Sequence, residues 1–108
     1  MRAGSLKQRV SIYDKGTITR NGVGEEIPAY DDLVATAWAA VEPLSGREFL
    51  EASQVQAQVT TRIRIRYRDG IRPEMQVVHG ADRYDVTAVL DQRGEGRELH
   101  LMCQRIIR

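Results

Sequence analysis

Val59-Thr60-Thr61-Arg62-Ile63-Arg64-Ile65-Arg66-Tyr67-Arg68, residues 59–68, is the stretch that decides the fold class. Apolar or β-branched residues at the odd positions alternate with polar residues at the even positions. This period of two is typical of a strand with one buried face and one solvated face. We therefore predict a strand over 59–68 whose inward side chains are Val59, Thr61, Ile63, Ile65 and Tyr67.

The same parity recurs in three other segments, which we predict to be strands with these inward residues: Leu6, Val10 and Ile12; Tyr84, Val86, Ala88 and Leu90; Leu99, Leu101 and Cys103. Strands are also expected over 34–42, where Trp38 is predicted to anchor the core, and over 75–79. Turn residues at 69–70, 80–82 and 92–96 predict antiparallel hairpins between successive strands. Residues 15–32 are polar and Gly-bearing, and we predict a long polar loop there, of a length that is usually functional or disordered.

One helix is predicted over 45–56. Ser45 can cap it, and Glu48 three residues later can return the hydrogen bond as in a capping box. The cap is the more ordinary role for Ser45, because no Gly-x-Ser-x-Gly elbow surrounds it. The fold class that follows is all-β and antiparallel, with one short α-helix and a long polar loop.

Composition limits the classes of function. The 108 residues suffice for one domain, 1–108, and 16 basic against 15 acidic residues give a net charge of only +1. One cysteine allows no internal disulfide, and two histidines are too few for a structural zinc site, so we expect no metal and no cofactor. No apolar run suggests a signal peptide or a membrane span. No nucleophile, base and orienting group can be assembled, so we expect no enzyme.

Charge is nevertheless segregated along the chain. Residues 14–45 carry six acidic and two basic residues, whereas Arg62, Arg64, Arg66 and Arg68 line one face of the predicted strand. Three interpretations of this arginine stripe stay open: a solvated face, an ion-pair surface between subunits, or a contact with DNA phosphates.

The linear order of motifs resembles the bacteriophage head-tail joining proteins, also called head-closure, adaptor or stopper proteins. The most specific part is Trp38-Ala39-Ala40-Val41-Glu42-Pro43-Leu44-Ser45-Gly46-Arg47-Glu48. The resemblance extends from Met1-Arg2-Ala3-Gly4 through Arg62-x-Arg64-x-Arg66-Tyr67-Arg68 and Tyr84-Asp85-Val86 to Glu98-Leu99-His100-Leu101-Met102-Cys103, so it covers essentially the whole chain.

The resemblance implies a small antiparallel β-barrel in a homo-oligomeric ring below the portal, within a virion assembled in the bacterial cytoplasm. Such a ring would close the DNA-filled head, let packaged DNA pass through its channel and dock the tail or the next connector. We expect loop 15–32 and segment 44–57 to supply the contacts, with 45–56 able to hold back DNA. Candidate interface or channel residues are Arg20, Glu25, Glu26, Asp31, Asp32, Ser45, Arg47, Glu48, Arg62, Arg64, Arg66 and Arg68.

Two alternatives remain at this point. A tail-completion or minor tail protein would share the viral setting but assemble on tails without heads. A small β-barrel nucleic-acid-binding protein would use the arginine stripe directly, and its affinity would fall steeply with salt.

Overall fold

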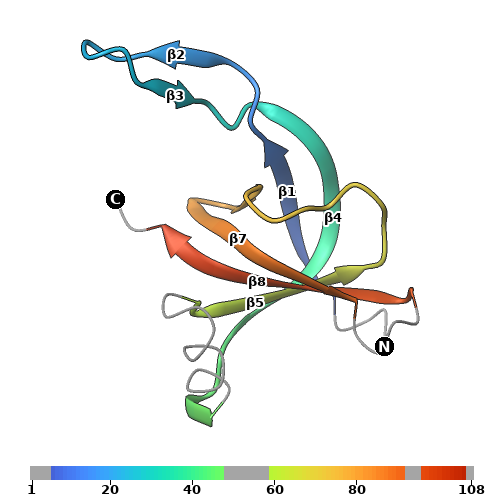
Figure 1. Cartoon of the computed structure of the whole chain (residues 1–108). Helices are drawn as coiled ribbons and strands as arrows, with labels where there is room; N and C mark the ends of the chain where they lie inside the picture. Colours follow the sequence, from blue (N-terminus) through green and yellow to red (C-terminus); the bar gives the residue numbers. More distant parts are fainter. Residues whose placement is uncertain (1–5, 48–58, 92–95, 107–108) are drawn as a thin grey trace.

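A six-stranded antiparallel barrel is the centre of the fold (Figure 1). The computed structural model describes residues 6–47, 59–91 and 96–106. In these ranges the strands are β1 (Gln8–Asp14), β2 (Ile18–Arg20), β3 (Glu26–Pro28), β4 (Asp32–Pro43), β5 (Thr61–Arg66), β6 (Gln76–His79), β7 (Asp82–Asp91) and β8 (Glu98–Ile106). The barrel order is β1-β4-β5-β8-β7-β6, and β6 pairs back onto β1, which confirms the predicted all-β antiparallel class.

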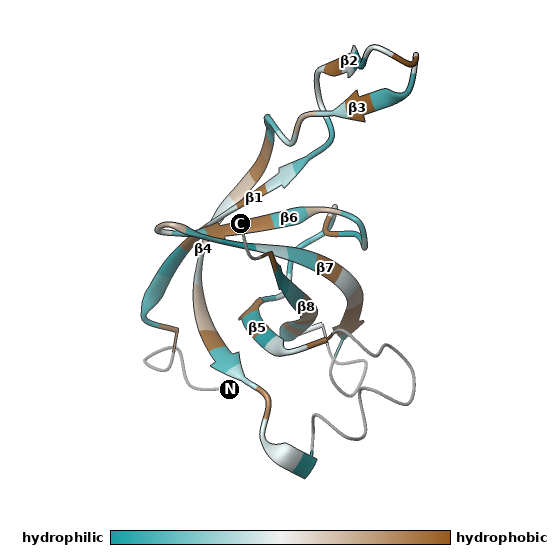
Figure 2. Cartoon of the chain, turned by 90° about the vertical axis from the view of Figure 1, so that its left-hand side faces the viewer, coloured by the Kyte–Doolittle hydropathy of each residue, from teal (hydrophilic) through white to brown (hydrophobic). Residues whose placement is uncertain are grey.

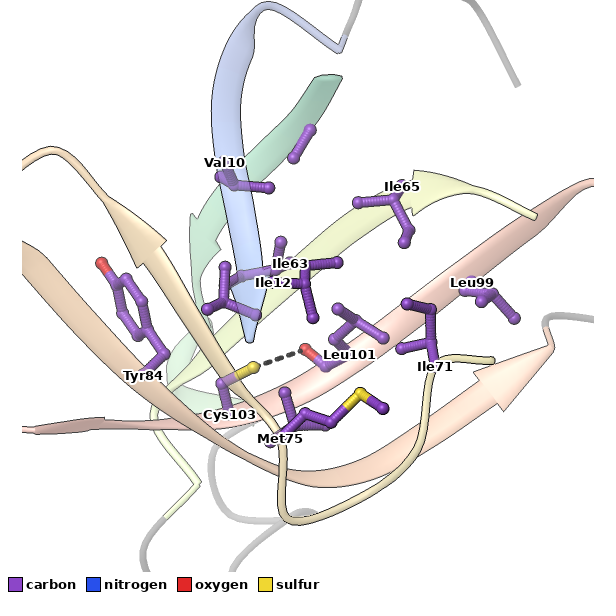
Figure 3. Packing of buried hydrophobic residues seen from close by; sticks show 13 residues of the cluster. Val10, Ile12, Ile63, Ile65, Ile71, Met75, Tyr84, Leu99, Leu101 and Cys103 are labelled. Carbon is purple, nitrogen blue, oxygen red and sulfur yellow. Dashed lines mark hydrogen bonds between the residues drawn. The ribbon is translucent and has the colours of Figure 1, made fainter. Parts of the chain in front are cut away.

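The inward-facing side chains of the barrel strands fill the barrel interior (Figure 3). Ile63 of β5 lies opposite Leu101 of β8, and neither is exposed to solvent. Ile71 and Met75, from the connection between β5 and β6, complete the core. Cys103 is buried as predicted, and its thiol donates to the carbonyl of Leu101 at 3.3 Å. Burial raises the pKa of the Cys103 thiol, so it behaves as a small apolar residue.

The predicted parity of segment 59–68 holds from Val59 to Ile65, all of whose odd residues are buried. It is wrong at Tyr67, which is 44% exposed. The strand ends at Arg66, and the chain then turns at Gly70, whose φ of 89° favours glycine. Tyr67 N still donates to Arg97 O at 3.0 Å, but Tyr67 lies beyond the end of β5, where the side chains need not keep alternating.

A β-bulge at Thr87 corrects the prediction for β7. Val86 pairs with Cys103, whereas Ala88 pairs with Met102, so Thr87 is an extra residue in its strand. An extra residue inverts the alternation that follows it. Val89 therefore packs against the core, and Leu90, expected inside, is 48% exposed.

Trp38 is not a core residue, contrary to the prediction. It lies opposite Arg9 on the outer face of the barrel and is 54% exposed, with the Arg9 guanidinium 5.1 Å from the ring centroid. β4 turns the smaller Ala37 and Ala39 toward the core instead. When a strand has small residues on both faces, the sequence pattern alone does not determine which face points to the core.

Successive strands also pair with one another less often than predicted. β5 pairs with β4 and β8, and β6 pairs with β1 and β7, so residues 69–70 do not form a hairpin turn between β5 and β6. The turn at Gly80 does join a hairpin, β6–β7, and its φ of 61° is of the kind expected there. The barrel closes because β6, which follows this crossing, pairs with β1.

The polar segment 15–32, predicted as a loop, contains a two-stranded hairpin instead. β2 and β3 pair only with each other and project away from the barrel (Figures 1 and 2). We call residues 16–31 the hairpin arm. Of the predicted helix 45–56, Gly46 and Arg47 are helical, and residues 48–56 lie outside the described residues.

Candidate functional site

The neck of the hairpin arm is fastened by backbone and side-chain hydrogen bonds. Gly16 N donates to Ala29 O at 2.8 Å, and Ala29 N donates to Thr17 O at 2.7 Å. The Asp31 carboxylate accepts from Thr17 N at 2.9 Å and from Thr17 Oγ1 at 2.7 Å. These two hydrogen bonds lower the pKa of Asp31, so the carboxylate stays ionised and holds both arm strands together. Asp31 is thus a clasp at the neck.

The tip of the arm is a tight, ordered turn. Asn21 Oδ1 accepts hydrogen bonds from Val23 N at 2.9 Å and from Glu25 N at 3.1 Å, and Gly24 N donates to Asn21 O at 3.0 Å. Gly24 adopts a φ of 86°, where a side chain would be strained. This turn presents Val23 to solvent, with 80% of it exposed.

The arm combines exposed apolar and acidic side chains. Arg20 Nη2 lies 3.3 Å from Glu26 Oε1 across the two strands, so these two charges largely cancel. Glu25 contacts only the Asn21 amide, at 3.5 Å, among the described residues. Ile18 and Ile27 are 57% and 47% exposed, and hydrophobic colour on β2 and β3 is visible in Figure 2. An exposed apolar arm is a candidate interaction surface.

The inner half of the arginine stripe is neutralised within the chain. Arg64 Nε lies 3.0 Å from Glu42 Oε1, and Arg64 Nη1 lies 3.1 Å from Glu98 Oε1. Arg62 Nε lies 3.2 Å from Glu42 Oε1, and His100 Nε2 lies 2.7 Å from Glu98 Oε1. We call these five residues the ion network. The side chains of Arg64 and Glu98 are only 20% and 11% exposed, which strengthens their pairing.

The ion network shifts the pKa values of Glu98 and Arg64. Burial alone would raise the pKa of Glu98, but the hydrogen bonds and charges of His100 and Arg64 outweigh it and lower the pKa. Burial alone would likewise lower the pKa of Arg64, but Glu42 and Glu98 outweigh it and raise the pKa. Both groups therefore stay charged, and the network contributes to the stability of the β4–β5–β8 sheet.

The outer half of the stripe borders a groove. A cavity of about 370 Å³, which we call the Trp38 groove, is lined by Leu6, Thr36, Ala37, Trp38, Arg66, Tyr67 and Arg68. Among the described residues, Arg66 and Arg68 pair with no carboxylate, and Tyr67 OH donates to Asp69 Oδ1 at 3.0 Å. That hydrogen bond raises the pKa of Tyr67. The groove therefore combines two exposed aromatic rings with unpaired positive charge.

The eleven predicted interface residues that the structure describes do not form one cluster. Arg20, Glu25 and Glu26 lie near the arm tip, Asp31 at its neck and Asp32 at the start of β4. Arg62 and Arg64 belong to the ion network, and Arg66 and Arg68 border the Trp38 groove. Ser45 and Arg47 follow β4, and Glu48 lies outside the described residues.

Sequence reasoning missed the apolar members of these surfaces. Val23 lies between two glycines in a polar segment, which is a signal for an exposed turn residue. Trp38 and Tyr67 carried no such signal, because alternation placed Tyr67 inside and Trp38, the single tryptophan, was expected to anchor the core.

In residues 6–47, 59–91 and 96–106, no three histidine, cysteine or carboxylate side chains gather as a metal would require. No helix within these same ranges has both the length and the apolar character for a membrane span.

Comparison with known proteins identifies the family. No curated protein matches the chain. The fold is similar to the solution structure of a protein from Shigella flexneri 2a, with a TM-score of 0.68, 23% identity and coverage of 96% of each chain. It is also similar to a chain in the virion of a native gene transfer agent particle, with a TM-score of 0.60, 19% identity and coverage of 95% of this chain and 97% of that one. A family model described as phage head completion protein matches residues 1–106, so the chain belongs to that family of structural virion proteins.

Proposed function

We propose that the chain assembles as a homo-oligomeric ring below the portal of a tailed phage or a phage-like particle. The ring closes the DNA-filled head, gives the tail or the next connector protein a docking surface, and surrounds the channel through which packaged double-stranded DNA passes. Assembly takes place in the cytoplasm of the bacterial host. The protein acts by binding, without catalysis.

The hairpin arm is the observation that carries this proposal. The barrel is closed in its described part, so its strands offer no free edge by which another chain could extend the sheet. A chain that assembles with others must then use projecting segments or side-chain surfaces. The arm is such a segment, ordered at its neck and tip and apolar at its exposed positions.

The twelve predicted residues take different roles in this proposal. Glu25, Asp32, Arg66 and Arg68 contact neighbouring proteins, as do Ser45, Arg47 and Glu48, which follow β4 in the sequence. Arg20, Glu26 and Asp31 keep the arm in shape, and Arg62 and Arg64 stabilise the barrel wall. A weak contact repeated around a ring is multiplied by the number of subunits, so no single interface has to be large.

Direct DNA binding by the whole arginine stripe is less well supported. Arg62 and Arg64 contact the carboxylates of Glu42 and Glu98, and a phosphate would have to displace these partners. Only Arg66 and Arg68 remain for phosphates along the stripe. A tail-completion role is separated from head closure by the experiment below.

Electron microscopy of particles assembled with and without this chain, combined with nuclease digestion of the packaged DNA, tests the proposal. Without the chain, we expect heads that have a portal but lose their DNA and carry no tails, beside complete free tails. Adding back the wild-type chain should restore protected DNA and tails. Normal heads with defective tails would move the protein to the tail. Wholly normal particles would overturn the connector role, and a DNA-binding assay in a salt series would follow.

A further inference from the structure

We propose that the hairpin arm of one subunit binds in the Trp38 groove of the next subunit. Val23 at the arm tip enters between the exposed rings of Trp38 and Tyr67, and Glu25 faces Arg66 and Arg68. This inference rests on the proposed ring and names the contact that forms it.

The two surfaces complement each other in polarity. Val23 is 80% exposed on the arm, and Trp38 and Tyr67 are 54% and 44% exposed in the groove, so joining them removes apolar area from water on both sides. A cavity of about 370 Å³ has room for an aliphatic side chain and part of its turn.

The two surfaces also complement each other in charge. On the arm, the Arg20–Glu26 pair cancels and leaves Glu25 as the net charge of the tip. The groove has Arg66 and Arg68 at its border, and Arg9 stacks on Trp38. Opposite charges at an interface fix the register of two partners and steer their encounter.

An arm cannot reach the groove of its own subunit. β1 runs from the side of the groove, where Leu6 precedes it, to the neck of the arm at Asp14, and its seven residues span about 20 Å. The arm then continues away from the barrel (Figure 1). The contact is therefore head to tail between different surfaces of two copies, and a contact of this kind generates a ring when its rotation closes.

The arm tip is ordered before binding. Asn21 Oδ1 fixes the turn by accepting hydrogen bonds from Val23 N and Glu25 N, and the Asp31 clasp fixes the neck. Because little backbone has to be ordered on association, more of the contact energy remains as affinity. A rigid tip also defines the angle between subunits.

A second cavity of the barrel is a poor alternative for the tip. This cavity of about 440 Å³ includes Glu74 and Asp85 in its lining, along with Lys15. Lys15 Nζ lies 3.8 Å from Glu74 Oε2 and offsets its charge, so Asp85 leaves this lining with a net negative charge that would repel Glu25. The aromatic rings that could pack on Val23 are also fewer, since Tyr30 alone is aromatic there. The Trp38 groove is the better match on both criteria.

Disulfide cross-linking in assembled particles tests the contact. The variant V23C/T36C carries one cysteine at the arm tip and one at an exposed position of the groove. Mild oxidation followed by a non-reducing gel should give a ladder of cross-linked copies, because each subunit offers both partners. The single variants V23C and T36C should remain monomeric on the gel, and buried Cys103 should not react.

A charge exchange provides a second measurement that does not depend on disulfide geometry. E25R and R68E should each lower the number of copies per purified head about tenfold, because each sets like charges opposite one another. The double variant E25R/R68E should restore incorporation. The matched control L90S removes an exposed apolar residue of β7, outside both surfaces, and should incorporate normally.

The outcomes separate this inference from the proposed function. Particles that contain the chain at the head but give neither a ladder nor rescue by the double variant would overturn the arm-in-groove contact alone. Dimers without larger products would overturn it too, because they indicate a reciprocal interface. If the chain is found on tails and not on heads, the proposed head-closure role fails, whatever the cross-linking shows.

Discussion

The Asp31 carboxylate fills the space that a side chain on Gly16 would need, because a Cβ added to Gly16 would lie 1.9 Å from Asp31 Oδ1. That oxygen is not free to rotate away, since the same carboxylate accepts both hydrogen bonds from Thr17. The backbone N of Asp32 would lie 3.3 Å from the new Cβ as well. The neck of the hairpin arm thus depends on a glycine at 16 and a carboxylate at 31.

The variant Gly16→Ala should therefore loosen the arm without unfolding the barrel. Asp31 must turn away and release Thr17, so amide hydrogen exchange of Thr17 and Ala29 should accelerate toward that of an open hairpin. The melting temperature should change little, because the arm contributes no residue to the core. Gly22→Ala is the control, since nothing lies within 4 Å of its added Cβ. Unchanged exchange in Gly16→Ala would contradict the clasp.

Replacing an arginine by alanine should lower the free energy of unfolding more in the inner half of the arginine stripe than in its outer half. Arg64→Ala leaves Glu98 and Glu42 without their shared partner in a mostly buried setting, and should lower the free energy of unfolding by about 1–3 kcal/mol. Arg68→Ala removes an exposed side chain and should stay within about 0.5 kcal/mol of wild type. Urea unfolding measures both values. Equal losses in the two variants would show that the ion network has no special part in stability.

The lowered pKa of Glu98 predicts how stability depends on pH. A group whose pKa is lower in the folded state stabilises the fold above its unfolded pKa, near 4.5, and this contribution is lost as the pH falls through the folded value. Glu98→Gln should be less stable than wild type at neutral pH, and the difference should narrow as the pH is lowered below about 4.5. Thermal unfolding of both proteins across this pH range provides the test. A difference that stays constant with pH would contradict the shift.

Trp38 provides an optical readout of the proposed ring contact. It is the only tryptophan in the chain and is 54% exposed, so its emission in the free subunit should be that of a solvated indole. When the chain is mixed with purified heads, filling of the groove should move the Trp38 emission to shorter wavelength. The heads must be ones whose own tryptophan emission does not change on mixing. Val23→Lys places a positive charge at the arm tip, opposite Arg66 and Arg68, and should abolish this shift. A shift of equal size in Val23→Lys would argue that something other than the arm fills the groove.

Local alternation was sufficient to predict most of the barrel wall. The inward residues of β5 from Thr61 to Ile65, and those of β8 from Leu99 to Cys103, follow from a period of two. The period is a property of the extended backbone itself, so it needs no knowledge of partners. The same reasoning failed at Leu90, because the bulge at Thr87 exists only in relation to β8.

The hairpin arm was recognisable from the sequence only as an unusual segment. Its polar, Gly-bearing composition indicated a segment outside the core, which is what the structure contains. Its strands are three residues each, too short to give a readable pattern. The clasp between Thr17 and Asp31 joins residues 14 positions apart, so spacing alone did not predict it.

By itself, the sequence determined the all-β class, the inward residues of the regular strands and, through its ordered motifs, the resemblance to head-tail joining proteins. Only the tertiary structure decided which arginines are available to a partner. Glu42 and Glu98 lie 22 and 34 positions from Arg64 and reach it because β4 and β8 flank β5, while no described carboxylate reaches Arg66 or Arg68. The physical reason is that charge pairing depends on distance in space, which strand order sets and a linear pattern does not contain.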